Sequence, residues 1–259
     1  MTFAIAAVGG ALAALERLRS TRFRAQAFLR PYVGTDAVYF ATGFVAAGAL
    51  GFAWFVVASG RIDAVTGLRA TVWPQVPWLV QVLVALAAID LGNYLCHWAM
   101  HRSDVLWAFH EAHHSSRNLD WIATFRSHLV EQAFRRIVGA LGVIVLAVPA
   151  DATAVAGTAF VAWGMLNHAN VRLPLGWVEG VLVTPRLHRH HHVPATVERN
   201  LGAVFVWWDR LRGTLVTRDV AQDVSFGLPR NRETYPQAWD TQLVAPFVRL
   251  WPRRLAARG

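Results

Sequence analysis

The chain has 259 residues, of which 55% are hydrophobic and 16% are charged. This composition favours a membrane protein over a soluble globule. The single cysteine, Cys96, excludes an internal disulfide and a cysteine-based metal site, and we expect it to pack as a small apolar residue. The formal net charge is +9 and every basic residue is an arginine. Because the arginines flank apolar segments instead of forming one stripe, we expect a membrane surface and no nucleic acid as their partner.

The first apolar segment runs from Phe3 to Leu15. At about 1.5 Å per residue it is too short to cross roughly 30 Å of hydrocarbon. Its arginines follow it, beginning at Arg17, whereas a cleaved signal peptide carries its basic residues first. We therefore predict that residues 1–34 form an N-terminal interfacial segment that lies on the membrane, with a spanning helix as the alternative.

Two segments are long and apolar enough to span a membrane, Ala37 to Ala58 and Trp78 to Ala99. A connector from Gly60 to Pro77 is predicted between them. The last turns of the second segment contain Asp90 and Asn93, which are costly in lipid unless they face a protein interior or a site. This polar end leads directly into the histidine-rich part of the chain.

The region from Arg102 to Glu131 is polar and is predicted to be a loop. Two apolar arms follow, Ile137 to Val148 and Thr153 to Asn167, and Pro149 marks the turn between them. Each arm is short for a full span, so we predict a partly immersed helical hairpin. The predicted fold is one domain, an all-α, multi-pass integral membrane bundle of about four membrane-embedded helices. Residues 215–259 would form a cytoplasmic C-terminal tail.

Histidines occur in three compact boxes. Residues three or four apart share one face of a helix, so each box presents its imidazoles to one side. Neutral imidazole suits iron, zinc, copper or nickel. Adjacent histidines point roughly 100° apart on a helix, so one ion can hardly take both members of the two adjacent pairs, and we infer two metal sites. The boxes are His97 and His101; His110, His113 and His114; and His188, His191 and His192.

The predicted topology brings all three boxes to one side of the membrane. The first box ends the second span, the second box precedes the hairpin, and the hairpin returns to deliver His168 and then the third box. Arginines are concentrated on that side, whereas the opposite loops hold only Arg61 and Arg69. The positive-inside rule therefore places a histidine-rich helical cap, with its dimetal site, in the cytoplasm.

Further residues accompany the boxes in a recurring order. The elements are Asp90-xxx-Tyr94-xx-His97-xxx-His101, His110-xx-His113-His114-Ser115, Arg126-Ser-His128-xx-Glu131, Asn167-His168-Ala-Asn170, Thr184-Pro-Arg-Leu-His188-Arg-xx-His191-His192 and Trp208-Asp209-Arg210-Leu-x-Gly213-Thr214. In this combination, residues 90–214 resemble the histidine-box core of the fatty acid hydroxylase/sterol desaturase superfamily of integral-membrane di-iron oxygenases. The chain departs from the family pattern at Leu129, where proline is usual, and at Leu201, where tyrosine is usual.

The resemblance implies that the eight box histidines are catalytic metal ligands and that His168 is a ninth ligand. It implies that His190 is incidental, because its counterpart in the family varies. His128 is expected either as a tenth ligand or as a residue that orients one.

The resemblance also implies residues that support the ligands. Glu111 or Glu131 would hydrogen-bond ligand imidazoles and thereby fix their tautomers. Asp209 and Arg210 are expected to form a structural pair close to the site.

The chemistry implied by the resemblance is the hydroxylation or desaturation of a lipid C–H bond, in a fatty acyl, sterol or related lipid. Two Fe ions, O2 and two external electrons would be used. Zinc can replace iron in purified protein because it generally outranks ferrous iron in affinity. The sequence contains no GxGxxG, P-loop or haem-attachment motif, so we expect the electrons to come from a separate ferredoxin- or reductase-like partner.

Two other classes of protein are alternatives. His110-Glu111-Ala-His113-His114 fits the HExxH pattern of zinc hydrolases, with Glu111 as the general base. Catalytic zinc needs only three protein ligands, however, which leaves the other boxes without a role. A non-enzymatic metal-binding or transport protein would carry polar ligands near the bilayer midplane, whereas these boxes lie at predicted helix ends and in loops.

Overall fold

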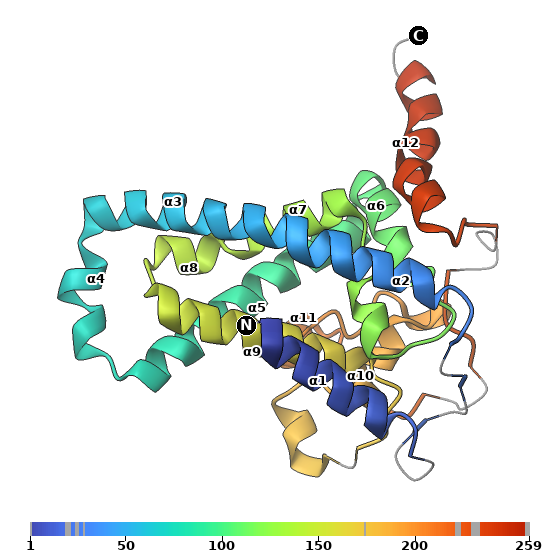
Figure 1. Ribbon diagram of the computed structural model, residues 1–259, viewed down its shortest axis with the longest axis horizontal. Helices are drawn as coiled ribbons and strands as arrows, with labels where there is room; N and C mark the ends of the chain where they lie inside the picture. The colour runs from blue at the N-terminus through green and yellow to red at the C-terminus, as the bar shows by residue number, and fades with distance from the viewer. Residues whose placement is uncertain are drawn as a thin grey trace.

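The computed structural model describes residues 2–18, 22–23, 26–27, 29–173, 175–220, 224–228 and 234–256. Within these ranges the regular secondary structure is helical, with two isolated β-bridges and no strand. The all-helical prediction is therefore confirmed for the part of the chain that is described. Figure 1 shows one long helix running the length of the molecule, with α7 (Leu129–Gly139) and α8 (Leu141–Val145) beside it and α12 (Trp239–Ala256) projecting away.

Both predicted spans are present as long helices. The first joins α2 (Val33–Tyr39), a π-helical stretch η1 (Phe40–Ala47) and α3 (Gly48–Thr66) into 34 helical residues, and the second is α5 (Trp78–Arg102) with 25 residues. Both are long and apolar enough to cross a membrane. Large apolar side chains on both helices face outward, among them Leu50, which is 70% exposed, and Leu79, which is 62% exposed.

The segment predicted as a connector between these helices is largely helical. Helix α3 continues through Arg61 and Asp63 to Thr66, because arginine and aspartate are tolerated inside a helix. It ends at Gly67, whose left-handed φ of 64° suits glycine. The remainder of the connector forms α4 (Leu68–Thr71) and η2 (Trp73–Gln75).

The region predicted as a polar loop also contains helices, because short polar side chains start them. The hydroxyl of Ser103 accepts from the backbone N–H of Leu106 at 3.4 Å, and the carboxylate of Asp120 accepts from that of Ala123 at 3.1 Å. The two helices that follow these caps are α6 (Asp104–His114) and η3 (Trp121–Phe125).

The predicted hairpin is present with a broken first arm. That arm begins at Leu129, earlier than predicted, and is interrupted at Ala140. The second arm begins directly after Pro149, as the turn signal predicts. The arms are α7 (Leu129–Gly139) with α8 (Leu141–Val145), and α9 (Ala150–His168). The later elements are η4 (Gly176–Gly180), α10 (Pro185–His191), η5 (Pro194–Thr196), α11 (Trp207–Arg212) and α12 (Trp239–Ala256).

Helix α5 lies at the centre of the bundle and contacts α6, α7, α8 and α9. Its closest approach to α7 is at Gly92 and Gly139: a Cβ atom on Gly92 would lie 2.5 Å from the Gly139 carbonyl oxygen. Cys96, also on α5, is buried as expected. This crossing packs the end of α7 against the middle of α5, and Arg135, nearer the start of α7, donates to Asn93 of α5 at 3.3 Å.

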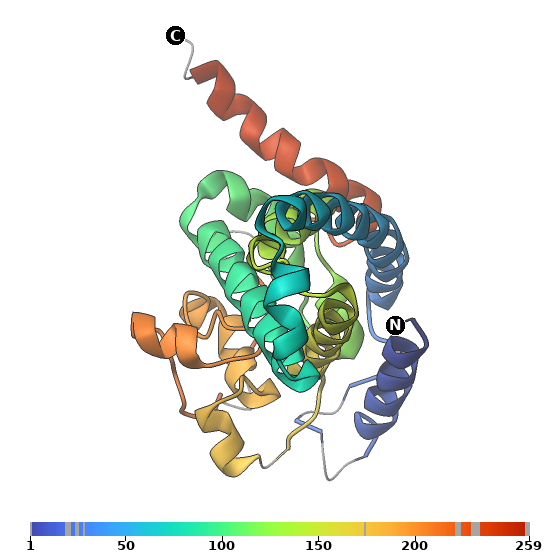
Figure 2. The same cartoon turned by 90° about the vertical axis from the view of Figure 1, so that its left-hand side faces the viewer.

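The predicted N-terminal helix is α1 (Thr2–Leu15), and it packs along α9. Its buried residues Ile5 and Leu12 form one apolar cluster with Met165 and Val171. Figure 2 shows α1 on the flank of the molecule, on the opposite side from α10 and α11.

Because the crossing at Gly92 has no room for a methyl group, Gly92→Ala should lower the thermal midpoint by several degrees, as expected for about 1–3 kcal/mol of overpacking. Gly60→Ala is the matched control, since a Cβ atom there meets nothing within 4 Å. It should leave the midpoint unchanged or slightly raised, because alanine is the better helix former. Equal midpoints for the two variants would contradict the close crossing.

Candidate metal centre

Four helices bring the histidines to one end of the bundle. His97 and His101 lie one turn apart at the end of α5, and His168 is the last residue of α9. Helix α6 carries the second box, and α10 carries His188 and His191 of the third, with His192 directly after its last residue. Helix α10 begins where the Thr184 hydroxyl accepts from the backbone N–H of Leu187 at 3.5 Å, so the third box lies on a helix as predicted.

Nine histidines converge in two groups within the described residues. In each group, one ring nitrogen from each residue lies within 4.8 Å of the others. The two groups adjoin, since the ring centroids of His113 and His114 are 5.4 Å apart. The members of each adjacent pair enter different groups, as their directions on the helix predict. The first group contains His97, His101, His110, His114 and His191, and the second contains His113, His168, His188 and His192.

Eight of these nine histidines are buried, and His101 is half-buried. The residues His110 and His191 are 0% exposed. Burial lowers the pKa of His113, His114 and His192 well below its ordinary value, and neighbouring histidines lower it further. Neutral imidazole is the form that binds a metal ion.

Five of the rings have Nδ1 turned away from the groups and bonded to an oxygen. A carbonyl or carboxylate oxygen only accepts, so in these rings the proton lies on Nδ1 and the Nε2 lone pair faces inward. The bonds run from His97 to the Leu201 carbonyl (2.8 Å), His110 to Glu131 Oε1 (2.9 Å), His113 to the Arg126 carbonyl (3.0 Å), His168 to the Gly164 carbonyl (2.9 Å) and His191 to the Arg199 carbonyl (3.3 Å).

The inward nitrogens fit metal ions. His113 and His168 both carry their proton on Nδ1, so the 3.3 Å contact between their Nε2 atoms joins two lone pairs. The Nε2 atoms of His97 and His191 are buried without a hydrogen-bond partner among the described residues. Nitrogens that bind one ion at about 2.0–2.1 Å lie roughly 3.3 Å apart in a tetrahedral arrangement, which is the distance between the Nε2 atoms of His113 and His168.

Glu131, on the first turn of α7, holds the ring of His110. Its carboxylate also lies 3.4 Å from Nη1 of Arg135. Burial alone would raise the pKa of Glu131, but His110 and Arg135 hold it at about 2. The charged carboxylate orients His110 and raises the basicity of its free nitrogen. The contacts of Glu131 therefore suit the role that the resemblance implies, which is to hydrogen-bond a ligand imidazole and fix its tautomer.

Asp90 of α5 holds the segment that precedes α11. Its carboxylate accepts from the backbone N–H groups of Val204 and Phe205 at 2.9 and 3.0 Å, and from Trp208 Nε1 at 2.8 Å. A carboxylate in the middle of a long apolar helix is therefore satisfied by protein, as its cost in lipid requires.

Asp209 positions the acceptor of His97. It accepts from two successive backbone N–H groups, the first that of Leu201 at 3.0 Å, and so fixes the Leu201 carbonyl that bonds to His97. The predicted pair of Asp209 with Arg210 is not formed: Arg210 donates instead to a backbone carbonyl of η4. The carboxylate of Asp209 accepts from backbone N–H groups instead, and the side chain of Arg210 is exposed at the surface.

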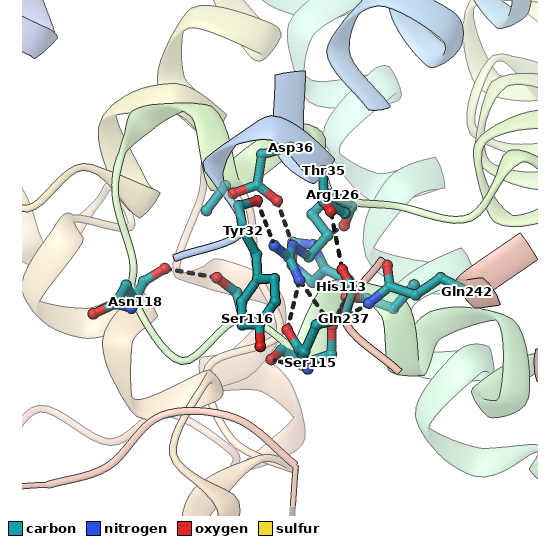
Figure 3. Close-up of polar contacts among 12 residues, drawn as sticks. Tyr32, Thr35, Asp36, His113, Ser115, Ser116, Asn118, Arg126, Gln237 and Gln242 are labelled. Carbon is teal, nitrogen blue, oxygen red and sulfur yellow. Dashed lines mark hydrogen bonds and ion pairs between the residues drawn. The ribbon is translucent and has the colours of Figure 1, made fainter. Parts of the chain in front are cut away.

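Arg126 lies beside the second group and is 1% exposed. Its carbonyl accepts from His113, and its guanidinium donates to Asp36, to Ser115 Oγ at 3.3 Å and to Gln237 Oε1 at 3.0 Å (Figure 3). These bonds fix the backbone that orients His113.

Arg30 extends this network to the residues before the first long helix. It donates to Asp36 and, at 2.6 and 2.7 Å, to both oxygens of Asp120. Arg30, Asp36 and Asp120 were not predicted from the sequence as residues of the site. An acidic residue directly before the first predicted span was the available signal for Asp36.

His128 and His190 lie outside both groups. His128 Nδ1 accepts from the backbone N–H of Val130 at 3.1 Å, and its Nε2 donates to the Leu243 carbonyl at 3.1 Å. Both nitrogens are engaged, so His128 caps α7 and the structure does not place it as a tenth ligand. His190 Nε2 donates to the Arg218 carbonyl at 2.6 Å, which fits its expected separation from the ligands.

Glu111 pairs with α12 instead of serving the histidines. Its Oε2 lies 2.5 Å from Nη1 of Arg249. A general base of the HExxH type would need its carboxylate free for a metal-bound water. The ion pair with Arg249 therefore weighs against the hydrolase alternative.

A cavity of about 570 Å³ leads away from the histidines between α3, α5, α7 and α9. His97 of the first group and His113, His168 and His188 of the second line one end. Along α9 the lining runs from His168 to Ala150, about 27 Å at 1.5 Å per residue. The far walls are apolar and include Phe52, Phe55, Val143, Ala154 and Phe160.

The model of the family described as Fatty acid hydroxylase matches residues 82–214. The chain therefore belongs to the fatty acid hydroxylase family, and the matched residues contain every element on which the resemblance was based.

The chain is similar to several curated proteins. It is 33% identical over 182 residues to ornithine lipid hydroxylase OlsE of Rhizobium tropici, covering 68% of this chain and 54% of that protein. It is 28% identical over 179 residues to the alkylglycerol monooxygenase of Danio rerio, covering 68% and 39%. The chain thus spans about half or less of the length of these relatives. No solved structure matches it.

His113→Ala and His191→Ala each remove one nitrogen from one group, so each should lower the metal bound per chain, measured by elemental analysis of purified protein, and abolish activity. His190→Ala is the matched control on the same helix as His191. It should retain full metal content and lose only about 1 kcal/mol of stability with its hydrogen bond. Full metal occupancy in the first two variants would show that His113 and His191 are not metal ligands.

Glu131→Gln keeps an oxygen near His110 but removes the charge, so it should weaken metal binding about 10–100-fold in a chelator competition. Asp151→Asn removes a carboxylate at the other end of the hairpin and is the control. Its metal affinity should equal that of the unaltered protein. Equal affinity for Glu131→Gln would show that the carboxylate does not tune His110.

Proposed function

We propose that this chain is a membrane-bound, O2-dependent di-iron enzyme that hydroxylates or desaturates a C–H bond of a lipid. The proposal rests on family membership together with one observation, the cavity whose one end is lined by both histidine groups and whose far walls are apolar. A zinc hydrolase does not require nine histidines in two groups, and it would require a free Glu111.

The two groups would each hold one iron ion, and the bound pair would supply O2 activation and C–H oxidation. The first group offers five imidazoles and the second offers four. Glu131 and the Leu201 and Arg126 carbonyls would keep the ligand tautomers fixed throughout turnover. The apolar walls would exclude bulk water and align the lipid chain.

The proposed placement in the membrane has the two long helices crossing it, α7 to α9 partly embedded and the histidine end in the cytoplasm. Exposed apolar residues such as Val145 (60%) and Val155 (44%) on the hairpin support this placement. A separate cytoplasmic ferredoxin- or reductase-like protein would deliver the two electrons. The names of the relatives, an ornithine lipid hydroxylase and alkylglycerol monooxygenases, support a lipid as the substrate.

Anaerobically purified protein, loaded with iron and studied by Mössbauer spectroscopy, should contain two irons per chain as a coupled pair. Exposure to O2 with a chemical reductant should change the spectrum. His191→Ala is the control and should not form the coupled pair. A single redox-silent zinc that persists through iron loading would contradict the proposal.

Cells that produce the protein and are grown under 18O2 should accumulate a lipid that is absent from cells producing His113→Ala. A mass increase with 18O retained in the lipid would identify hydroxylation. Loss of two hydrogens without 18O would identify desaturation. Identical lipid profiles across a range of host membranes would count against lipid oxidation.

A further inference from the structure

The cavity contains two cations and no anion. Arg135 and Arg136 of α7 both line it, and the described lining residues include no aspartate or glutamate. Arg135 has Glu131 as an ion-pair partner and also donates to Asn93 at 3.3 Å. Arg136 has no carboxylate partner among the described residues.

Arg136 is incompletely bonded. Its Nη2 donates to the Gly43 carbonyl at 3.3 Å, but its Nε is buried without an acceptor among the described residues. A charged guanidinium in such surroundings is costly unless an anion joins it.

The opposite helix is shaped to receive this side chain. A Cβ atom at Gly51 would lie 3.1 Å from the Arg136 side chain, and one at Gly43 would overlap the amide of Gln132. Glycine at these two positions therefore gives Arg136 and Gln132 room between α7 and the long first helix. Arg136 is thus built into the cavity wall and is not a surface arginine folded inward by chance.

We propose that Arg136 binds an anionic oxygen group, a carboxylate or a phosphate, on the lipid substrate. The planar guanidinium presents donors in a fork that matches two oxygens of such a group. Gln132, which also lines the cavity, adds an amide nearby. This inference rests on the proposed function and adds the chemical class of its substrate.

The position of Arg136 also orients the lipid. Its neighbour Arg135 bonds to Asn93, which lies one helical turn before His97, so the arginines are close to the histidine end. The apolar walls extend beyond them towards Ala150. A lipid anchored at Arg136 therefore has its polar end beside the metal centre and its chain in the apolar part of the cavity. Oxidation falls within the first few carbons from the anion.

Isothermal titration calorimetry on the full chain in neutral detergent tests this site. The probes are palmitate, hexadecyl phosphate and hexadecanol, which share one chain length. The unaltered protein should bind at least one of the two anions about tenfold or more tightly than the alcohol, as expected for a hydrogen-bonded charge. Whichever anion binds more tightly distinguishes a carboxylate lipid from a phosphate lipid.

Arg136→Gln should lose this preference, and Arg136→Lys should keep part of it because the charge remains without the fork. Arg61→Gln, at the opposite end of the first long helix, is the control for a lost positive charge and should keep the full preference. Equal binding of all three probes to the unaltered protein, or an undiminished preference in Arg136→Gln, would overturn the proposal. If Arg136→Gln does not fold, the proposal is tested by the binding preferences of the unaltered protein and of Arg136→Lys for the same three probes.

Binding of these probes requires neither O2 nor electrons, so it separates this proposal from the oxygenase function. Preferential anion binding by a protein that neither incorporates 18O into a lipid nor removes hydrogen from one would overturn the proposed oxidation and leave the anion site. If oxidation occurs, the position of the 18O label tests the orientation. A label in the distal half of the chain would overturn the placement of the polar end.

Discussion

The structure depends on keeping the Nε2 lone pairs of buried, neutral imidazoles directed at one another. Unpaired buried acceptors cost about 1–3 kcal/mol each, so this arrangement of lone pairs carries a substantial free-energy penalty unless metal ions are bound. Five of the rings are held in this orientation by hydrogen bonds from Nδ1–H to oxygen atoms, most of which belong to other segments of the chain. Metal binding removes this penalty, and part of its free energy is therefore folding free energy.

The acceptors behind the rings are themselves fixed by buried charges. Asp209 positions the carbonyl that bonds to His97, and Arg126 carries the one that bonds to His113. Arg126 is held by Asp36, which is shared with Arg30. Breaking a buried ion pair leaves an uncompensated charge, which costs more than the pair contributes. Removal of one of these charges would therefore disturb the atoms that orient the histidines.

Much of this architecture follows from local sequence signals. Apolar length predicts the two long helices, and the angle between adjacent histidines predicts that ligand pairs divide between two groups. What the sequence hides is contact between distant segments. Nothing near His128 shows that its ring caps α7 and reaches the Leu243 carbonyl, and nothing near Asp36 shows that it meets Arg126. The sequence predicted that the first span ends at Ala58, whereas α3 continues to Thr66. This difference has another cause: charged residues such as Arg61 and Asp63 do not by themselves end a helix.

The composition of the two groups has a consequence for biosynthesis. Four of the five histidines in the first group have been synthesised once residue 114 is reached, whereas half of the second group lies in residues 188–192. A chain emerging from the ribosome therefore holds a nearly complete first group long before the second exists. Both groups are completed only when α10, which carries His188 and His191, packs against α9.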